Sequence, residues 1–231
     1  MALGLGSYLV ALATGLELAR GNPFADLNLI ERIGDELFGT MFGEWSLDQL
    51  TKRGQPFGFA HGVCGELYAM LRWSRARSWP LGAPVLEALD RLTSLAGGSA
   101  DVLRLPRSVG SNDYVPSWCN GSAGYVLLFT SAYGMTREEK FIRAAAGFAA
   151  DAIQSADERL NLCCGCAGRA FALLALYQIT GESKVLAAAR DLCDRAQAQE
   201  GSSLFNGAGG PAILAFEMES VGGARMPILD D

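Results

Sequence analysis

The sequence predicts an all-α protein in which stacked helical hairpins form a closed ring, and two observations support this prediction. Glycine pairs with the spacing Gly-x-x-Gly recur along the 231-residue chain, and each pair opens an apolar segment. After most of these segments a short turn leads into an amphipathic segment of helical period, whereas no window shows strand-like alternation. Because such recurrence indicates a repeat architecture, we expect a single domain over residues 1–231 with about five αα-hairpins.

The glycine pairs mark the start of the first helix in each hairpin. Residues 125–129 and 170–177, which follow two of the pairs, are apolar throughout, so we expect these helices to be covered on every side. A degenerate first copy of the pattern covers residues 4–8 and opens the apolar residues 6–16. The four clear copies are Gly62/Gly65, Gly121/Gly124, Gly165/Gly168 and Gly207/Gly210.

The second helix of each hairpin is expected on the outside, because its apolar residues lie on one face. Thr136-Arg137-Glu138-Glu139 has the spacing of a capping box, which predicts a helix start just before Lys140. Inner helices that are apolar all round need neighbours on every side, and this favours a closed ring over an open superhelix. Three sets of residues at helical spacing indicate the outer helices: Val85, Leu89, Leu92 and Ala96; Phe141, Ala145, Phe148 and Ala152; Val185, Ala189, Leu192 and Ala196.

Side chains next to the glycines converge, in such a ring, on one rim from different hairpins. Cys119 and the adjacent Cys163 and Cys164 occupy these places, and so does His61, the only histidine of the chain. Neighbouring cysteines in a chain of this size fit metal binding in a reducing compartment better than a disulfide scaffold. We therefore expect these four residues, which are far apart in sequence, to meet.

The remaining cysteines do not require a chemical role. Cys64 and Cys193 fall at small-residue or apolar positions, and we expect both to pack in the core. Cys166 is expected to be inert, but it stays open as an alternative metal ligand. The competing interpretation of the Cys163-Cys164 pair is that both are small core residues.

Composition and charge restrict the partners. The net charge is −6 and the basic residues are scattered, so the chain has no electrostatic footprint for nucleic acid or for an anionic membrane surface. The apolar residues 2–16 lack a basic start and contain early glycines, which favours a buried helix over a signal sequence. These features together predict a cytoplasmic protein.

Three segments resemble the signature segments of the lanthionine synthetase C-like (LanC-like) family, in the right order. They are Ala60-His61-Gly62-x-x-Gly65, Trp118-Cys119-x-Gly121-x-x-Gly124 and Leu162-Cys163-Cys164-Gly165-x-x-Gly168, and residues 224–230 resemble the C-terminal end of the family. The resemblance implies an α/α toroid with a zinc ion at its rim. It also implies an enzyme that adds a cysteine thiol of a precursor peptide across dehydroalanine or dehydrobutyrine, which makes a thioether ring.

The resemblance assigns roles to the candidate residues. Cys119, Cys163 and Cys164 would bind Zn²⁺, with Cys163-Cys164 resembling the all-cysteine variant of the third segment. Three protein ligands and one open position are the pattern of a catalytic zinc site. His61 would act as the general acid or base, since the unperturbed pKa of histidine lies near working pH.

The number of hairpins differs from the family. Members typically have seven hairpins, so about five here imply that the N-terminal ones are missing. An apolar helix at each end of the arc would then face water, and we expect a fused domain, a partner or a second copy to complete the toroid.

Two other functions remain as alternatives. A degenerate LanC-like domain would keep zinc but only bind a peptide or regulate a fused partner. Another α/α-toroid enzyme, such as a glycoside hydrolase, would need two carboxylates across the cavity, and no such pair is evident. Glu66, Asp113 and Arg169 lie near the motifs and are expected to line the cavity, without an assigned role.

Overall fold

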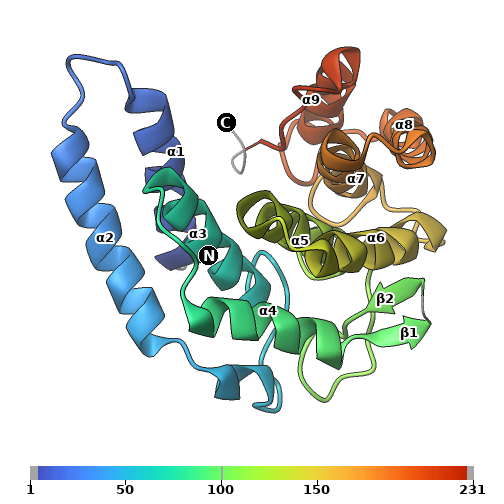
Figure 1. Cartoon of the computed structure of the whole chain (residues 1–231). Coiled ribbons are helices and arrows are strands. Elements are labelled where there is room, and N and C mark those ends of the chain that lie inside the picture. Colours follow the sequence, from blue (N-terminus) through green and yellow to red (C-terminus); the bar gives the residue numbers. More distant parts are fainter. Residues whose placement is uncertain (1–4, 100, 228–231) are drawn as a thin grey trace.

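Helices alternate along the chain between an inner and an outer layer in the computed structural model, which describes residues 5–99 and 101–227 (Figure 1). The all-α prediction is confirmed, and four inner helices begin at the four clear glycine pairs. The inner helices are α1 (Leu5–Ala19), α3 (Val63–Ala76), α5 (Ser122–Thr136), α7 (Cys166–Thr180) and α9 (Gly209–Glu217). The outer helices are α2 (Leu27–Glu44), α4 (Ala83–Leu95), α6 (Glu139–Gln154) and α8 (Ser183–Ala196), and two short 3₁₀ helices cover Leu47–Leu50 and Met218–Ser220.

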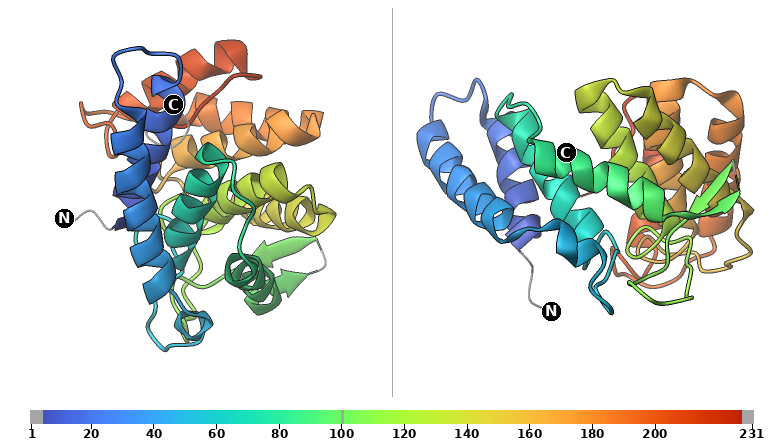
Figure 2. Two further views of the ribbon diagram at one scale, coloured as in Figure 1. Left: turned by 60° about the vertical axis from the view of Figure 1, so that its left-hand side comes forward. Right: turned by 60° about the horizontal axis from the view of Figure 1, so that its bottom comes forward.

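The inner helices pack side by side in chain order around an arc, as in an α/α toroid. Each contacts the next, from α1 through α3, α5 and α7 to α9, and the outer helices cover them from outside (Figures 1 and 2). Helices α1 and α9 are the two ends of this arc. The loops before α3, α5, α7 and α9 gather on one side of it, so residues beside the glycines of these loops come together there (Figure 2).

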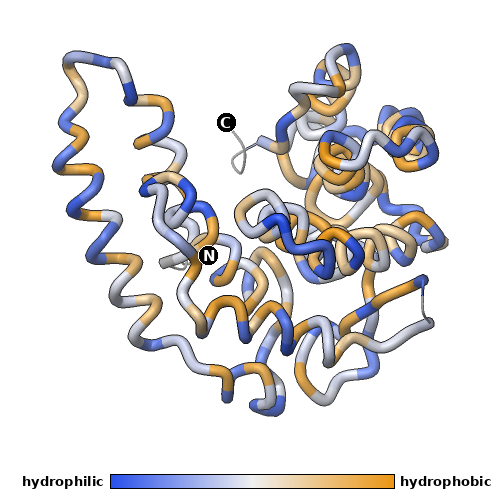
Figure 3. The backbone as a smooth tube through the Cα atoms, viewed as in Figure 1, coloured by the Kyte–Doolittle hydropathy of each residue, from blue (hydrophilic) through white to orange (hydrophobic). Residues whose placement is uncertain are grey.

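The two layers differ in how much of each helix is buried. Residues 122–130 of α5 and 166–174 of α7 are buried without interruption. Helix α6 instead buries one face, which contains Phe141, Ala145, Phe148 and Ala152, and α8 does the same. This difference between layers follows the hydropathy pattern (Figure 3) and confirms the assignment of inner and outer helices.

At Gly124 and Gly168, the second glycine of the pair lets the helix start pack closely against its own loop and against the loop of the preceding hairpin. A Cβ atom at Gly124 would lie 2.4 Å from the Trp118 carbonyl oxygen and 2.8 Å from Cβ of Phe59, which belongs to the preceding hairpin. A Cβ at Gly168 would likewise lie 2.2 Å from the Leu162 oxygen and 3.1 Å from Cβ of Trp118. The glycines therefore set the spacing of the rim loops.

Replacing Gly124 with alanine should destabilise the fold by about 1–3 kcal/mol, the usual cost of overpacking a filled core. Gly134 is a matched control, because it lies in the same helix and a Cβ there would meet nothing within 4 Å. Gly134→Ala should stabilise the protein by about 0.5–1 kcal/mol. Urea unfolding measures both changes, and equal effects of the two substitutions would contradict this account of the glycine pairs.

Two local features differ from the sequence prediction. A short antiparallel hairpin, β1 (Gly97–Ser99) with β2 (Val102–Arg104), follows α4, and its three-residue strands are too short to show alternation. Helix α6 begins at Glu139 as expected, but no capping box forms. Thr136 is the last residue of α5, and its hydroxyl accepts a hydrogen bond from the Glu138 N–H.

Arg169 does not line the cavity as expected. Its side chain is fully buried, and its guanidinium donates hydrogen bonds to the carbonyl oxygens of Ala152, Ser155 and Asp157. These carbonyls lie at and just beyond the C-terminal end of α6, where positive charge is favourable. Arg169 therefore joins α7 to α6 and has a structural role.

Two predictions on the ends of the chain fall partly outside the described residues. Gly4 of the first copy lies there, and so do residues 228–230 of the C-terminal segment, although Ala224 and Met226 of that segment are buried. Among the described helices, none has the length and apolar character that a membrane span requires.

Candidate metal centre

Hydrogen bonds between equivalent residues join the rim loops. The residue two positions before the first glycine donates its backbone N–H to the carbonyl of the equivalent residue in the next hairpin. The Ala60 N–H donates to Cys119 O at 2.8 Å, that of Cys119 to Cys163 O at 3.4 Å, and that of Cys163 to Phe205 O at 2.9 Å. This ladder brings four loops that are far apart in sequence to one place.

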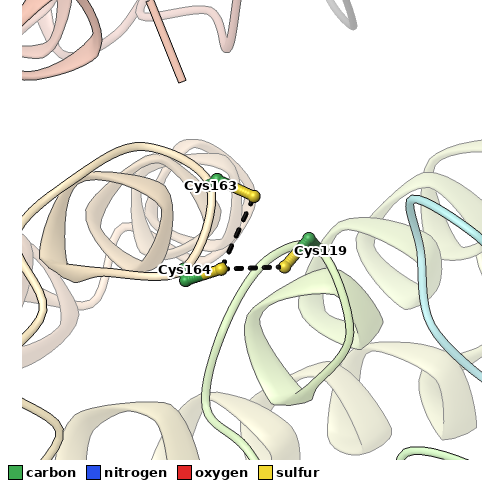
Figure 4. A group of neighbouring side chains, drawn as sticks. All are labelled: Cys119, Cys163 and Cys164. Atoms are coloured by element: carbon green, nitrogen blue, oxygen red, sulfur yellow. Dashed lines mark hydrogen bonds between the residues drawn. The ribbon is translucent and has the colours of Figure 1, made fainter. Parts of the chain in front are cut away.

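The ladder places the three predicted cysteines in one cluster. The Sγ atoms of Cys119 and Cys164 are 3.4 Å apart, those of Cys163 and Cys164 are 3.5 Å apart, and all three lie within 4.8 Å of one another (Figure 4). Cys119 is buried, while Cys163 and Cys164 are half-buried. The Cys164 N–H also donates to Asn161 Oδ1 at 2.8 Å, which holds the loop in place.

The donor set fits a zinc ion. Tetrahedral Zn²⁺ with Zn–S bonds of about 2.3 Å needs sulfurs about 3.8 Å apart, close to the distances observed here. The cluster contains three side chains, so a fourth coordination position is left for another ligand. The three residues therefore fit a metal ion, with a further coordination position left open.

The three thiols influence one another's ionisation. The pKa of Cys119 is lowered to about 5, first because the Cys163 thiol stabilises the thiolate and then because Ser117 and Cys164 also do so. The pKa of Cys163 is raised, chiefly because its proton is held by the Cys119 thiolate. Burial raises the pKa of Cys164, and the nearby Cys119 charge adds to this effect. The cluster therefore has one thiolate ready to bind a cation before the other two thiols lose their protons.

His61 lies in the rim loop next to that of Cys119 but outside the cysteine cluster. It follows Ala60, whose N–H donates to the Cys119 carbonyl, and its own side chain is exposed. The structure therefore brings the backbone of this segment to the site, as expected, whereas the expected meeting of all four side chains is limited to the three cysteines.

The other cysteines and the acidic residues near the motifs do not belong to this cluster. Cys64 and Cys193 are buried in the core, as expected. Cys166 is fully buried in the first turn of α7 and does not belong to the cluster. Asp113 is exposed and pairs with Arg107, while burial raises the pKa of the half-buried Glu66.

Two residues at the site carried no signal in the sequence. The side-chain amide of Asn120 donates to Cys119 Sγ at 3.3 Å. Arg159 is held by Asp157, which is the main reason that its pKa is raised, and the Cys164 and Cys119 thiolates raise it further. Asn120 supplies an N–H group to the Cys119 sulfur, and Arg159 places a positive charge near the Cys119 and Cys164 sulfurs.

Comparison with known proteins places the chain in a family. Residues 3–220 match the model of the lanthionine synthetase C-like proteins, so the chain belongs to the LanC-like family. It is also 26% identical over 189 residues to the LanC-like protein GCL1 of Arabidopsis thaliana. The match covers 74% of this chain and 42% of that relative, so the chain spans less than half the length of the curated relative. This membership sets aside the glycoside-hydrolase alternative.

Proposed function

We propose that the chain is the metal-binding catalytic part of a lanthionine cyclase, which joins a peptide cysteine to dehydroalanine or dehydrobutyrine. The observation that supports this most strongly is the cluster of Cys119, Cys163 and Cys164 at the rim. Their three sulfurs would hold Zn²⁺ and leave one position for the sulfur of the substrate. When bound, zinc would keep that substrate cysteine as a thiolate near neutral pH, where a free thiol is mostly protonated.

The chemistry requires one addition and two proton transfers, because the thiol loses its proton before the addition and the α-carbon gains one after it. The substrate thiolate adds to the β-carbon of the dehydro residue, so a C–S bond forms and the C=C π bond breaks. The electron pair moves onto the α-carbon and its carbonyl as an enolate, which then takes up a proton at the α-carbon. Three anionic ligands withdraw less electron density than two thiolates and an imidazole would, which keeps the substrate sulfur nucleophilic.

His61 is the proposed proton donor and acceptor. It would accept the proton of the incoming thiol or donate one to the enolate, and imidazole does both near neutral pH. Its exposed position beside the Cys119 loop supports this role, because a peptide on the rim could reach it.

A metal- and peptide-binding domain without cyclase activity is the second candidate. The position of His61 outside the cysteine cluster is compatible with it. The two functions share the metal site and differ only in turnover.

Thioether formation on a dehydrated peptide that keeps one free cysteine separates the two candidates. Addition changes no mass, so the product is detected by loss of the thiol that an alkylating reagent would label. The cyclase proposal expects metal-dependent loss of this thiol, abolished by a chelator and restored by Zn²⁺. Loss of the thiol at the same rate without protein would contradict it, and peptide binding without turnover would favour the second candidate.

The ends of the arc support a proposal about partners. Tyr8 and Leu18 of α1 are 52% and 68% exposed, and Phe216 of α9 is 70% exposed, which is unusual for large apolar side chains on inner helices. We expect further helices, from a fused domain, a partner or a second copy, to cover these ends.

The isolated chain should therefore self-associate or bind an apolar dye, measured by size-exclusion chromatography with light scattering and by dye fluorescence. Replacing Leu18 and Phe216 with serine should reduce both effects, while the same change at the exposed Ile153 of α6, away from the ends, should not. A dye-silent monomer with cooperative unfolding would show that the arc needs no cover.

A further inference from the structure

The hydrogen bond from Asn120 to the Cys119 sulfur is a feature that the proposed mechanism does not use. Asn120 occupies the position directly before the first glycine of its pair, the position that His61 and Cys164 have in other hairpins. Its Nδ2 lies 3.3 Å from Cys119 Sγ. The hydroxyl of Ser117, which precedes Cys119 in the sequence, lies 3.6 Å from the same sulfur. Cys119 is thus buried between two polar side chains.

The fold leaves room for this amide. A Cβ at Gly58 would lie 2.5 Å from Oδ1 of Asn120 and 2.9 Å from the Cys119 carbonyl oxygen. Gly58 belongs to the preceding rim loop, so the amide of Asn120 lies in a space that two hairpins share. A side chain at position 58 would occupy the space that the amide uses when it donates to sulfur.

The three-thiolate ligand set would carry excess negative charge, which a hydrogen-bond donor can stabilise. Three thiolates exceed the charge of a divalent ion by one, and a bound substrate thiolate raises the excess to two. Hydrogen bonds from N–H groups stabilise anionic acceptors and are stronger than bonds between neutral groups. They also withdraw electron density from the sulfur that accepts them, which makes that sulfur a poorer nucleophile.

We propose that Asn120 is a positioning residue that keeps Cys119 a stable metal ligand and, by drawing charge from its sulfur, leaves the substrate thiolate as the reactive sulfur of the site. This inference rests on the proposed metal site. It concerns a residue outside the ligand set, whose effect is transmitted through Cys119. The site would contain four thiolate sulfurs, three from the protein and one from the substrate. Because each of them could attack the dehydro residue, the protein sulfurs must be less reactive than the substrate sulfur.

The test compares Asn120→Ala, which removes the donor, with Asn120→Asp, which replaces the donor by a carboxylate of similar shape. Asn206 supplies the matched control, because it holds the equivalent position two hairpins further along the chain and is exposed. Metal affinity, measured by competition with a chelator, should fall by about 10–100-fold in both Asn120 variants, the usual effect of losing a group that supports a metal ligand. Asn206→Ala and Asn206→Asp should bind as the wild-type chain does.

A spectroscopic signature separates this role from a merely structural one. In the cobalt-substituted protein, the sulfur-to-cobalt charge-transfer band should move to lower energy in Asn120→Ala, because Cys119 regains electron density, while circular dichroism stays unchanged. A wild-type band and affinity in Asn120→Ala would overturn the inference, as would a weakening seen only in Asn120→Asp, which would reflect added charge. If the wild-type chain binds neither zinc nor cobalt, the proposed metal site and this inference fail together.

Discussion

Replacing Cys119 and Cys163 together with alanine should reduce the bound zinc from about one ion per chain to almost none. One sulfur, that of Cys164, would remain of the three that lie within 4.8 Å of one another. A single thiolate cannot hold zinc against a chelator, because structural and catalytic sites need at least three protein ligands. Elemental analysis of protein purified in the presence of zinc measures the loss.

Cys193→Ala is the control for this experiment. Cys193 is also a buried, free cysteine, but it lies in the outer helix α8 and takes no part in the cluster. The zinc content of this variant should equal that of the wild-type chain. Zinc retained unchanged in the double variant would remove the basis of the assignment.

His61→Asn should slow thioether formation by roughly 10²–10⁴-fold, the usual contribution of a general acid or base. The zinc content should stay unchanged, because the imidazole lies outside the cysteine cluster and its side chain is exposed. The rate is measured from the thiol-labelling assay on a dehydrated peptide, and the metal from elemental analysis of the same sample.

Measuring the zinc content and the rate together distinguishes the ways in which this prediction could be wrong. Loss of zinc in His61→Asn would make His61 a ligand. An unchanged rate with full zinc would make it structural and would favour the second candidate function. Only slow turnover at full metal occupancy agrees with proton transfer.

Much of the architecture could be predicted from the sequence because it repeats. The glycine pairs mark the starts of α3, α5, α7 and α9, since only glycine fits where the loop carbonyls and the neighbouring hairpin press against the helix. Residues such as Phe141 and Phe148 recur at helical spacing because one face of an outer helix is buried, and this spacing located α6.

The cysteine cluster could also be predicted, because equivalent positions in a repeat meet at one rim. The hydrogen-bond ladder from Ala60 through Cys119 and Cys163 to Phe205 is the physical basis of that inference. Sequence position alone could not show which neighbours of these residues point toward the site. His61 lies outside the cysteine cluster, and its catalytic role stays a prediction.

Other contacts depend on the path of loops that no local pattern describes. Asn120 reaches Cys119 Sγ because Gly58 of another hairpin leaves space for its amide. Arg169 was expected to line the cavity. Its side chain lies in the core instead, because the guanidinium donates hydrogen bonds to carbonyl oxygens at and beyond the end of α6. The β1–β2 hairpin packs Leu103 against Gly147 of α6, and three-residue strands leave no periodic signal.

X-ray absorption at the zinc edge tests the central claim most directly, because it counts the sulfurs around the metal with and without substrate. The wild-type chain should show three sulfurs at about 2.3 Å and one oxygen or nitrogen at about 2.0–2.1 Å. A peptide with a free cysteine should replace the light atom by a fourth sulfur. Four sulfurs before any peptide is added would indicate a closed structural site that takes a further thiol as its fourth ligand, and would contradict the account.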